Sequence, residues 1–242
     1  MSDKWKITIV CDNNPYLQGL KTEWGFSALI SSEDEKILFD TAESDSILRY
    51  NMDKLGINPK EINKLFLSHA HGDHTGGLGY FLSINPYVSI YFPKSFPDNF
   101  SKQLTKIGST PIPIKDAYEI SKNISSTGEL LTGFIPEHAM VISTPEGLVI
   151  ITGCAHPGLI HIVEKAKMIY KSEPYLLLGG FHFFDKGLGD VFFIANKLKE
   201  MGIKYVAPCH CTGQNGIAWL HEIFGNNLIT VGVGKVVELP IS

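Results

Sequence analysis

The sequence predicts an α/β fold, because short apolar runs alternate with segments of helical spacing along its 242 residues. Four of the apolar runs share a second feature: each ends in a loop of small residues that carries a histidine. In α/β sheets, binding sites are commonly built in the loops beyond the strand ends. We therefore expect one domain over residues 1–242, with the four histidine-bearing loops converging on one site.

The composition is that of a globular protein and argues against nucleic acid as a partner. Hydrophobic residues make up 44% of the chain and charged residues 19%. With 25 acidic and 21 basic side chains the net charge is −4, whereas nucleic-acid binding needs a basic surface. No stretch approaches the roughly 18 apolar residues of a membrane span, and residues 1–6 lack the apolar region of a signal peptide. We expect a cytoplasmic protein without a membrane partner.

The first half of the chain is expected to alternate strands and helices. Strands are predicted at residues 6–11, 26–30, 37–39, 65–67 and 88–92. Helices are predicted at residues 44–55, 78–84 and 100–107, the first of them ending at Gly56. The remainder of residues 93–115 is rich in Pro, Ser and Lys and is expected to form a loop.

The second half repeats the alternation. Several short strands are expected within residues 117–144, followed by strands at 148–152, 176–178, 205–207, 228–231 and 235–239. Helices are expected at residues 159–170, 191–201 and 217–224. Residues 13–23, 93–115 and 185–190 could shape a substrate pocket, the last one flexing at Gly187 and Gly189.

The strongest chemical signal is the segment His69-x-His71-x-Asp73-His74, directly after the strand at 65–67. Imidazole and carboxylate together suit zinc and similar metals. Residues two apart in an extended backbone point to the same side, so His69 and His71 can share one ion. A bend at Gly72 can bring Asp73 and His74 to a second ion. Two ions about 3.5–4 Å apart can lower the pKa of a bridging water toward roughly 7.

The segment LSHAHGDHTGGL at residues 67–78 resembles the metal-binding signature of the metallo-β-lactamase superfamily. Five flanking pieces resemble one branch, the dihydropterin-methyl-ribofuranosylaminobenzene-phosphate synthase-like proteins: GFS (25–27), LFDT (38–41), GCAHPG (153–158), GGFH (179–182) and HCTG (210–213). The resemblance runs from about Lys6 to the C-terminus. It implies an αββα sandwich, in which two mixed sheets pack face to face with helices on the outer faces.

The resemblance also implies a ligand set for two divalent ions, with Zn as the first candidate and Fe or Mn as alternatives. His69 and His71 would bind the first ion, Asp73 and His74 the second, and His210 would complete the second site. The third histidine of the first site is assigned to His156, with His138 as its competitor.

Three further residues have roles implied by the resemblance. Cys154 stands where the superfamily usually has a bridging aspartate, so it is an additional candidate ligand or a buried packing residue. Asp40 matches a strand-end aspartate that orients a ligand imidazole or the histidine loop. His182 would contact the substrate or donate a proton to the leaving group. Cys209 and Cys211 are expected to point away from the metal, because neighbours on a strand alternate faces.

These features favour a metal-dependent hydrolase that attacks an ester, phosphoester or lactone-like small molecule, with Asp73 orienting the hydroxide. The alternative is a transferase that condenses a pterin diphosphate with a ribofuranosylaminobenzene phosphate on the same metals. Four aromatic residues near the site loops could stack a pterin or belong to the core: Trp24, Phe26, Phe181 and Phe183. A di-iron oxidase of this fold is disfavoured, because it would have a carboxylate in place of His71.

The partner is expected to be a small molecule, and two features bear on its charge. The sequence has a single arginine, Arg49, so few bidentate phosphate contacts are available. Lysines at positions 94, 102, 106, 115 and 186 could meet a phosphorylated substrate or could simply favour solubility. The oligomeric state is left open between a monomer and a homodimer.

Overall fold

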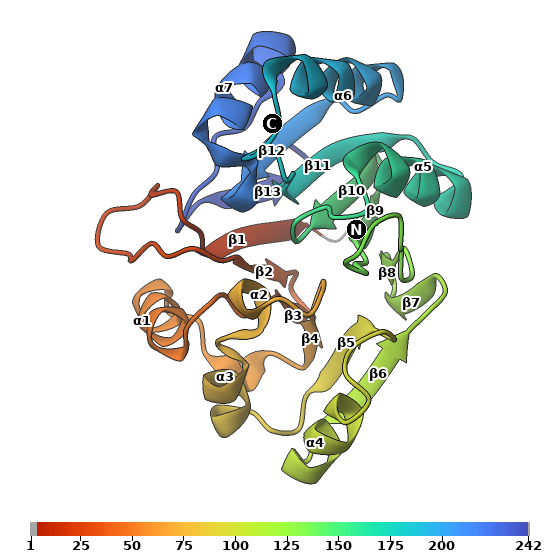
Figure 1. Cartoon of the computed structure of the whole chain (residues 1–242). Helices are drawn as coiled ribbons and strands as arrows, with labels where there is room; N and C mark the ends of the chain where they lie inside the picture. Colours follow the sequence, from red (N-terminus) through yellow and green to blue (C-terminus); the bar gives the residue numbers. More distant parts are fainter. Residues whose placement is uncertain (1–3, 242) are drawn as a thin grey trace. The chain divides into compact units, whose positions relative to one another are not determined.

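Two mixed β-sheets with helices make up the computed structural model, which describes residues 4–241 (Figure 1). The chain divides into two units by its internal contacts. The first unit runs to Ile114 and takes in the chain from Gly232 onward, and the second spans Lys115–Val231. Each sheet lies within one unit. The two mixed sheets and the α+β class agree with the sequence-based expectation, while the single domain over 1–242 stays a prediction.

The first unit contains a seven-stranded sheet of order β13-β1-β2-β3-β4-β5-β6. Its strands are β1 (Trp5–Cys11), β2 (Ser27–Ser31), β3 (Lys36–Phe39), β4 (Lys64–Phe66), β5 (Ser89–Pro93), β6 (Thr110–Ile114) and β13 (Val236–Leu239). Pairing is antiparallel from β13 to β3 and parallel from β3 to β6. Because Phe39 and Phe66 are partners in the parallel register, the residues after β3 and β4 leave the sheet at the same edge.

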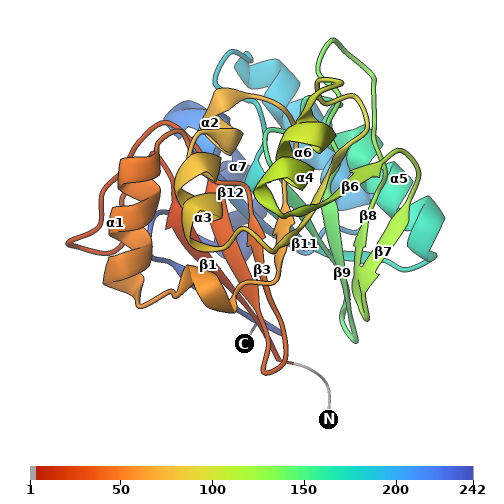
Figure 2. The same ribbon diagram turned by 90° about the horizontal axis from the view of Figure 1, so that it is seen from below.

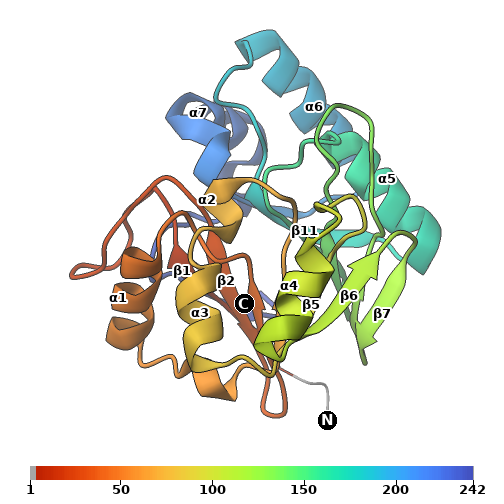
Figure 3. The same ribbon diagram turned by 60° about the horizontal axis from the view of Figure 1, so that its bottom comes forward.

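The helices of the first unit are α1 (Asp45–Leu55), α2 (Gly72–Thr75), α3 (Leu78–Ile84) and α4 (Phe100–Ile107), with a 3₁₀ turn at Pro59–Glu61. Ser44 caps α1 by accepting from the Ile47 N–H, and Gly56 ends the helix in the left-handed region, as predicted. Figures 2 and 3 show α1, α3 and α4 along one face of this sheet, where apolar side chains such as Leu48, Phe81 and Leu104 are buried.

The second unit contains a six-stranded sheet of order β12-β11-β10-β9-β8-β7. Its strands are β7 (Tyr118–Ser121), β8 (Ile124–Ser126), β9 (Met140–Thr144), β10 (Gly147–Thr152), β11 (Pro174–Gly180) and β12 (Tyr205–Cys209). The strands β10, β11 and β12 are parallel, and Gly179 pairs with both Thr152 and Pro208. The three strands therefore end at one edge, which places the loops that follow them side by side.

The helices α5 (Leu159–Tyr170), α6 (Leu188–Glu200) and α7 (Gly213–Phe224) pack on this sheet, and Figure 1 shows them grouped together. Two 3₁₀ turns, His210–Thr212 and Gly225–Asn227, flank α7. The apolar face of α5, which includes Ile162 and Val163, is buried in the same cluster as Ile150 and Leu177 of the sheet. No helix in the described part of the chain is long and apolar enough to cross a membrane.

The structure corrects three sequence-based expectations. Residues 110–114 form the strand β6 instead of a loop. The strand lies at the edge of the sheet, where prolines are tolerated, and Pro111 and Pro113 are the reason why the sequence predicted a loop there. Residues 228–231 are not a strand, since only an isolated bridge joins Leu228 to Val206. Helix α6 begins at Leu188, so Gly189 lies in a helix rather than in the flexible loop that was predicted.

Candidate metal centre

The ligand residues of the first unit lie at the carboxyl end of β4. His69 and His71 occupy the loop between β4 and α2, and Asp73 and His74 lie within the short helix α2. His69 and His74 are completely buried, whereas His71 and Asp73 are partly exposed. The segment therefore presents a buried side to the protein and an open side on which a substrate could approach.

The four side chains converge at distances that suit a metal. The His69 Nε2 and His71 Nδ1 atoms are 3.2 Å apart, and the His69 and His74 rings have centroids 4.2 Å apart. The His74 Nε2 atom lies 3.6 Å from the Asp73 carboxylate. Two nitrogens that bind one tetrahedral zinc at roughly 2.0–2.1 Å are separated by about 3.4 Å. The donor atoms of this segment thus fit a divalent ion.

Asp40, the residue after β3, fixes the orientation of this segment. Its carboxylate accepts from the Ser68 N–H and hydroxyl at 2.7 Å each and lies 2.6 Å from His74 Nδ1. A carboxylate on one ring nitrogen leaves the other free for a metal and sets the tautomer of the imidazole. Asp40 therefore orients both the histidine loop and the His74 ring.

Asp40→Asn is expected to lower the metal affinity of the first unit by about 10–100-fold. The amide must keep an oxygen toward the Ser68 N–H, so its NH₂ group would donate to His74 Nδ1 and move the ring proton to Nε2. Competition with a chromophoric chelator would measure the change. The control is Asp34→Asn, on an exposed turn, and equal affinities for the two variants would contradict the role given to Asp40.

Close backbone packing holds α2 in place. A Cβ on Gly76 would lie 1.9 Å from the Glu43 carbonyl oxygen, and one on Gly77 would lie 2.3 Å from that of Thr41. The Gly76 N–H also lies 2.8 Å from the Ala42 carbonyl. Because neither glycine has a side chain, the helix α2 can pack directly against the backbone of the segment that follows Asp40.

Gly76→Ala is expected to destabilise the protein by about 3 kcal/mol, because the added methyl group meets backbone rather than a flexible side chain. Gly72→Ala is a matched control, since a Cβ there meets nothing within 4 Å. Chemical denaturation of both variants would measure the difference. If the two substitutions had equal effects, the close packing of Gly76 would not be a constraint.

The second unit carries its candidate ligands in the three loops at the common edge of β10, β11 and β12. Cys154 and His156 follow β10, His182 follows β11, and His210 follows β12. One donor atom from each of Cys154, His156 and His182 lies within 4.8 Å of the others. His210 is completely buried and opens a 3₁₀ turn. The arrangement confirms that these three histidine-bearing loops lie together.

A buried glutamate that the sequence analysis missed holds the loop after β10. Glu137 is completely buried, and one carboxylate oxygen accepts from the N–H groups of Gly153, Cys154 and Ala155 at 3.0 Å. The other oxygen accepts from the His156 N–H at 2.9 Å. Four charge-assisted bonds offset the cost of burying this carboxylate and fix the backbone of both candidate ligands.

The orientation of the Cys211 side chain differs from the prediction that it points away from the site. His210, Cys211 and Thr212 form a 3₁₀ turn, so the face alternation of a strand does not apply to them. The Cys211 thiol lies 3.7 Å from the Cys154 carbonyl oxygen and hydrogen-bonds to His182. Cys209 remains buried within β12, in line with a packing role.

The contacts of Cys211 shift its own pKa and that of His182. Burial raises the pKa of Cys211, but its bonds to Cys154 and His182 and the charge of His210 outweigh this and hold the pKa well below its ordinary value. The bond to Cys211 raises the pKa of His182 above its ordinary value, and partial burial opposes this.

The remaining histidines have other surroundings. His138 is completely buried, and its Nδ1 atom lies 2.8 Å from the Ser126 hydroxyl. Among the described residues of the second unit, the candidate ligand group that contains His156 does not contain His138. His161 lies on α5 and is half-buried, and His221 on α7 is exposed. These observations favour His156 over His138 as the candidate ligand.

The aromatic residues divide into core and surface. Phe26, Phe181 and Phe183 are almost completely buried, so they belong to the core. Trp24 is 46% exposed and Phe184 is 56% exposed, and the Phe184 ring lies 5.0 Å from the His182 ring. Phe184 was not singled out from the sequence, although its position two residues after His182 could have identified it.

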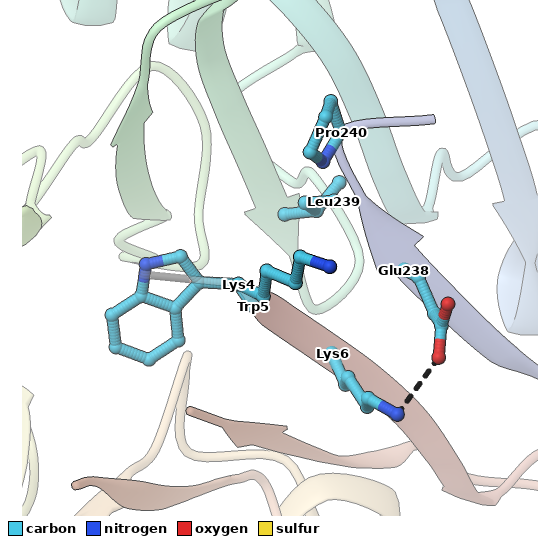
Figure 4. A pocket seen from close by; sticks show the side chains of 6 residues that line it. All are labelled: Lys4, Trp5, Lys6, Glu238, Leu239 and Pro240. Atoms are coloured by element: carbon cyan, nitrogen blue, oxygen red, sulfur yellow. Dashed lines mark ion pairs between the residues drawn. The ribbon is translucent and has the colours of Figure 1, made fainter. Parts of the chain in front are cut away.

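A pocket in the first unit is lined by residues at the start of β1 and at the end of β13 (Figure 4). Its lining consists of Lys4, Trp5, Lys6, Glu238, Leu239 and Pro240, with a volume of about 370 Å³. Lys6 and Glu238 form an ion pair at 2.8 Å that spans the two strands. None of the six lining residues is a histidine or a cysteine.

Comparison with known proteins identifies the family. The model of the metallo-beta-lactamase superfamily matches residues 25–210, which include the candidate ligands of both units. The chain belongs to the metallo-β-lactamase superfamily. The chain resembles superfamily members that are named as hydrolases or as a synthase. The chain is therefore an enzyme of hydrolase or synthase type.

Relatives match over nearly the whole length. A Methanocaldococcus jannaschii protein named 7,8-dihydropterin-6-methyl-4-(beta-D-ribofuranosyl)-aminobenzene-5'-phosphate synthase is 28% identical, over 98% of this chain and 97% of its own. An uncharacterised protein of the same organism, MJ0448, is 30% identical over 96% of this chain and 100% of its own. Ribonuclease Z of Streptococcus gordonii is 30% identical, over only 43% of this chain and 34% of its own.

Solved structures confirm the predicted fold class. The structure of Tm1679, described as a metal-dependent hydrolase of the beta-lactamase superfamily, has a TM-score of 0.81 and 26% identity and covers 97% of this chain and 99% of its own. Human tRNase Z, short form, shares the fold with a TM-score of 0.67 and 16% identity over 98% of this chain and 100% of its own. Both sheets of the chain therefore belong to a metallo-β-lactamase fold.

Proposed function

We propose that the protein is a metal-dependent hydrolase that acts on an ester or phosphoester bond of a small molecule. The observation that carries the proposal is the convergence of His69, His71, Asp73 and His74, with Asp40 bound to the far nitrogen of His74. This arrangement has the donor types and the supporting carboxylate of a catalytic metal site.

The proposed ligands are taken from the sequence-based expectation, and the chain is proposed to be one domain over residues 1–242. His69, His71, Asp73 and His74 belong to the first unit, and His156, His210 and Cys154 to the second. The family model supports this set because it spans all of these positions. Two divalent ions, Zn in the first instance, would when bound supply a nucleophilic hydroxide at neutral pH and polarise the electrophile.

The side chains have separate tasks in this proposal. Asp73, partly exposed beside His74, orients the attacking water and accepts a hydrogen bond from it. Asp40 keeps the proton of His74 on Nδ1. His182 would contact the substrate or donate a proton to the leaving group. The substrate would be a cytoplasmic small molecule, and exposed lysines such as Lys94 could meet a phosphate on it.

A second candidate function is condensation of a pterin diphosphate with a ribofuranosylaminobenzene phosphate. It is supported by the name of the Methanocaldococcus jannaschii relative, which matches nearly the whole chain. Phe184, exposed beside His182, offers a ring on which a flat heterocycle could stack.

The two functions can be separated on one metal-loaded sample. Hydrolysis of a chromogenic phosphodiester and a carboxylic ester would be measured beside pyrophosphate release from the pterin substrate, with and without the aminobenzene partner. Metal-dependent hydrolysis without condensation supports the first proposal, and partner-dependent pyrophosphate release supports the second. Wild-type protein that is folded yet binds no divalent metal would contradict both.

A further inference from the structure

The cysteine and two histidines in the loops after β10 and β11 form a group that lies wholly within the second unit. One donor atom from each of Cys154, His156 and His182 lies within 4.8 Å of the others, and the His156 and His182 rings have centroids 4.6 Å apart. Ligands of a four-coordinate zinc lie roughly 3.3–3.8 Å apart. Small side-chain adjustments would therefore bring all three donors onto one ion.

The hydrogen bonding of the His182 ring suits a metal ligand. Its Nδ1 atom is buried and has no hydrogen-bond partner among residues 4–241, although a buried polar nitrogen normally has one. The hydrogen bond to Cys211 therefore falls on Nε2. In the first unit His74 has a comparable pattern: Asp40 lies 2.6 Å from its Nδ1 atom, and its Nε2 atom would face the proposed metal.

The backbone around the group is held in a costly conformation. His182 has a φ of 54° and Ala155 one of 60°, both in the left-handed region that non-glycine residues seldom adopt. Strained residues of this kind persist where the surrounding structure holds them, and they cluster at functional sites. In the loop that carries Cys154 and His156, four hydrogen bonds from backbone N–H groups to the Glu137 carboxylate keep the backbone in this conformation.

We propose that Cys154, His156 and His182 form a thiolate–bis-imidazole site that binds one borderline-soft divalent ion such as Zn²⁺ using ligands of the second unit alone. The donor set of one thiolate and two imidazoles suits such ions. The inference rests on the proposed function in taking Cys154 and His156 as ligands. The inference assigns His182 as a metal ligand and not as a proton donor. It also predicts that this site binds its ion without His69, His71 and His74.

The test uses Co²⁺ as the probe with the full-length protein stripped of metal, in a His71→Ala background that weakens the first unit's site. The expected result is a near-ultraviolet thiolate-to-cobalt absorption band that saturates at one equivalent. Cys154→Ser should abolish the band. His182→Asn, chosen because asparagine tolerates the left-handed backbone, should weaken cobalt binding at least about tenfold. His221→Ala, at an exposed helix position, should leave the titration unchanged.

The outcomes separate the inference from the proposed function. Absence of the band in the His71→Ala background, or a His182→Asn titration equal to that of its parent, would overturn the inference. Neither result would affect the proposed hydrolase, which instead fails if His71→Ala retains wild-type activity. Circular dichroism of each variant would establish that it is folded before the titration.

Discussion

His71→Ala is expected to reduce the rate of hydrolysis by roughly a thousandfold and to remove at least one equivalent of bound metal. The His71 Nδ1 atom lies 3.2 Å from His69 Nε2, so its loss takes away one of two adjacent donors. Metal polarisation stabilises a transition state by several kcal/mol, and about 4 kcal/mol corresponds to a thousandfold. Elemental analysis and initial rates under saturating substrate would measure both effects.

The matched control for His71→Ala is His221→Ala, which removes an imidazole from an exposed position on α7. It should retain the metal content and the rate of the wild type. His71 is partly exposed, so its replacement should leave the fold intact. Full metal content together with full activity in His71→Ala would refute the assignment of the first unit's ligands.

Glu137→Ala is expected to lower the free energy of unfolding by roughly 3–5 kcal/mol. The substitution removes the acceptor of four buried N–H groups and leaves a cavity, and each buried donor without a partner costs about 1–3 kcal/mol before relaxation. For a chain of this size the melting temperature should fall by roughly 10 °C. Urea denaturation monitored by circular dichroism would give the free energy directly.

Two variants sharpen the Glu137 prediction. Glu164→Ala removes an exposed glutamate from α5 and should change the stability by less than about 0.5 kcal/mol. Glu137→Gln keeps the size of the side chain but turns an NH₂ group toward backbone donors, so it should also destabilise the protein. A Glu137→Ala variant as stable as the Glu164→Ala variant would show that water replaces the carboxylate without loss.

The sequence predicted correctly those elements that depend on interactions between residues close together in the chain. Helix α1 was predicted from the helical spacing of Ile47, Leu48 and Leu55 and from Gly56 as a stop, and the structure shows the Ser44 cap and the left-handed Gly56 that end it. The cluster from His69 to His74 was predicted because three histidines and one aspartate occur within six residues directly after a buried strand. The family signature then identified the fold, which the family model and the solved structures confirm.

The features that were missed depend on contacts between distant residues. Glu137 bonds to N–H groups 16 to 19 residues further along the chain, and no spacing rule connects those positions. Strand β6 contains two prolines and is tolerated only because it lies at a sheet edge, which the sequence does not reveal. Cys211 turned toward His182 because a 3₁₀ turn replaced the expected strand geometry.

The carboxylate of Glu137 also constrains how the enzyme can recognise a negatively charged substrate. A run of successive backbone N–H groups after a strand is a common cradle for phosphate. In this chain the N–H groups of residues 153–156 already enclose an internal anion, supplied by the protein itself. With Arg49 as the only arginine of the sequence, the positive charge for a substrate phosphate would come from lysines and from any bound metal.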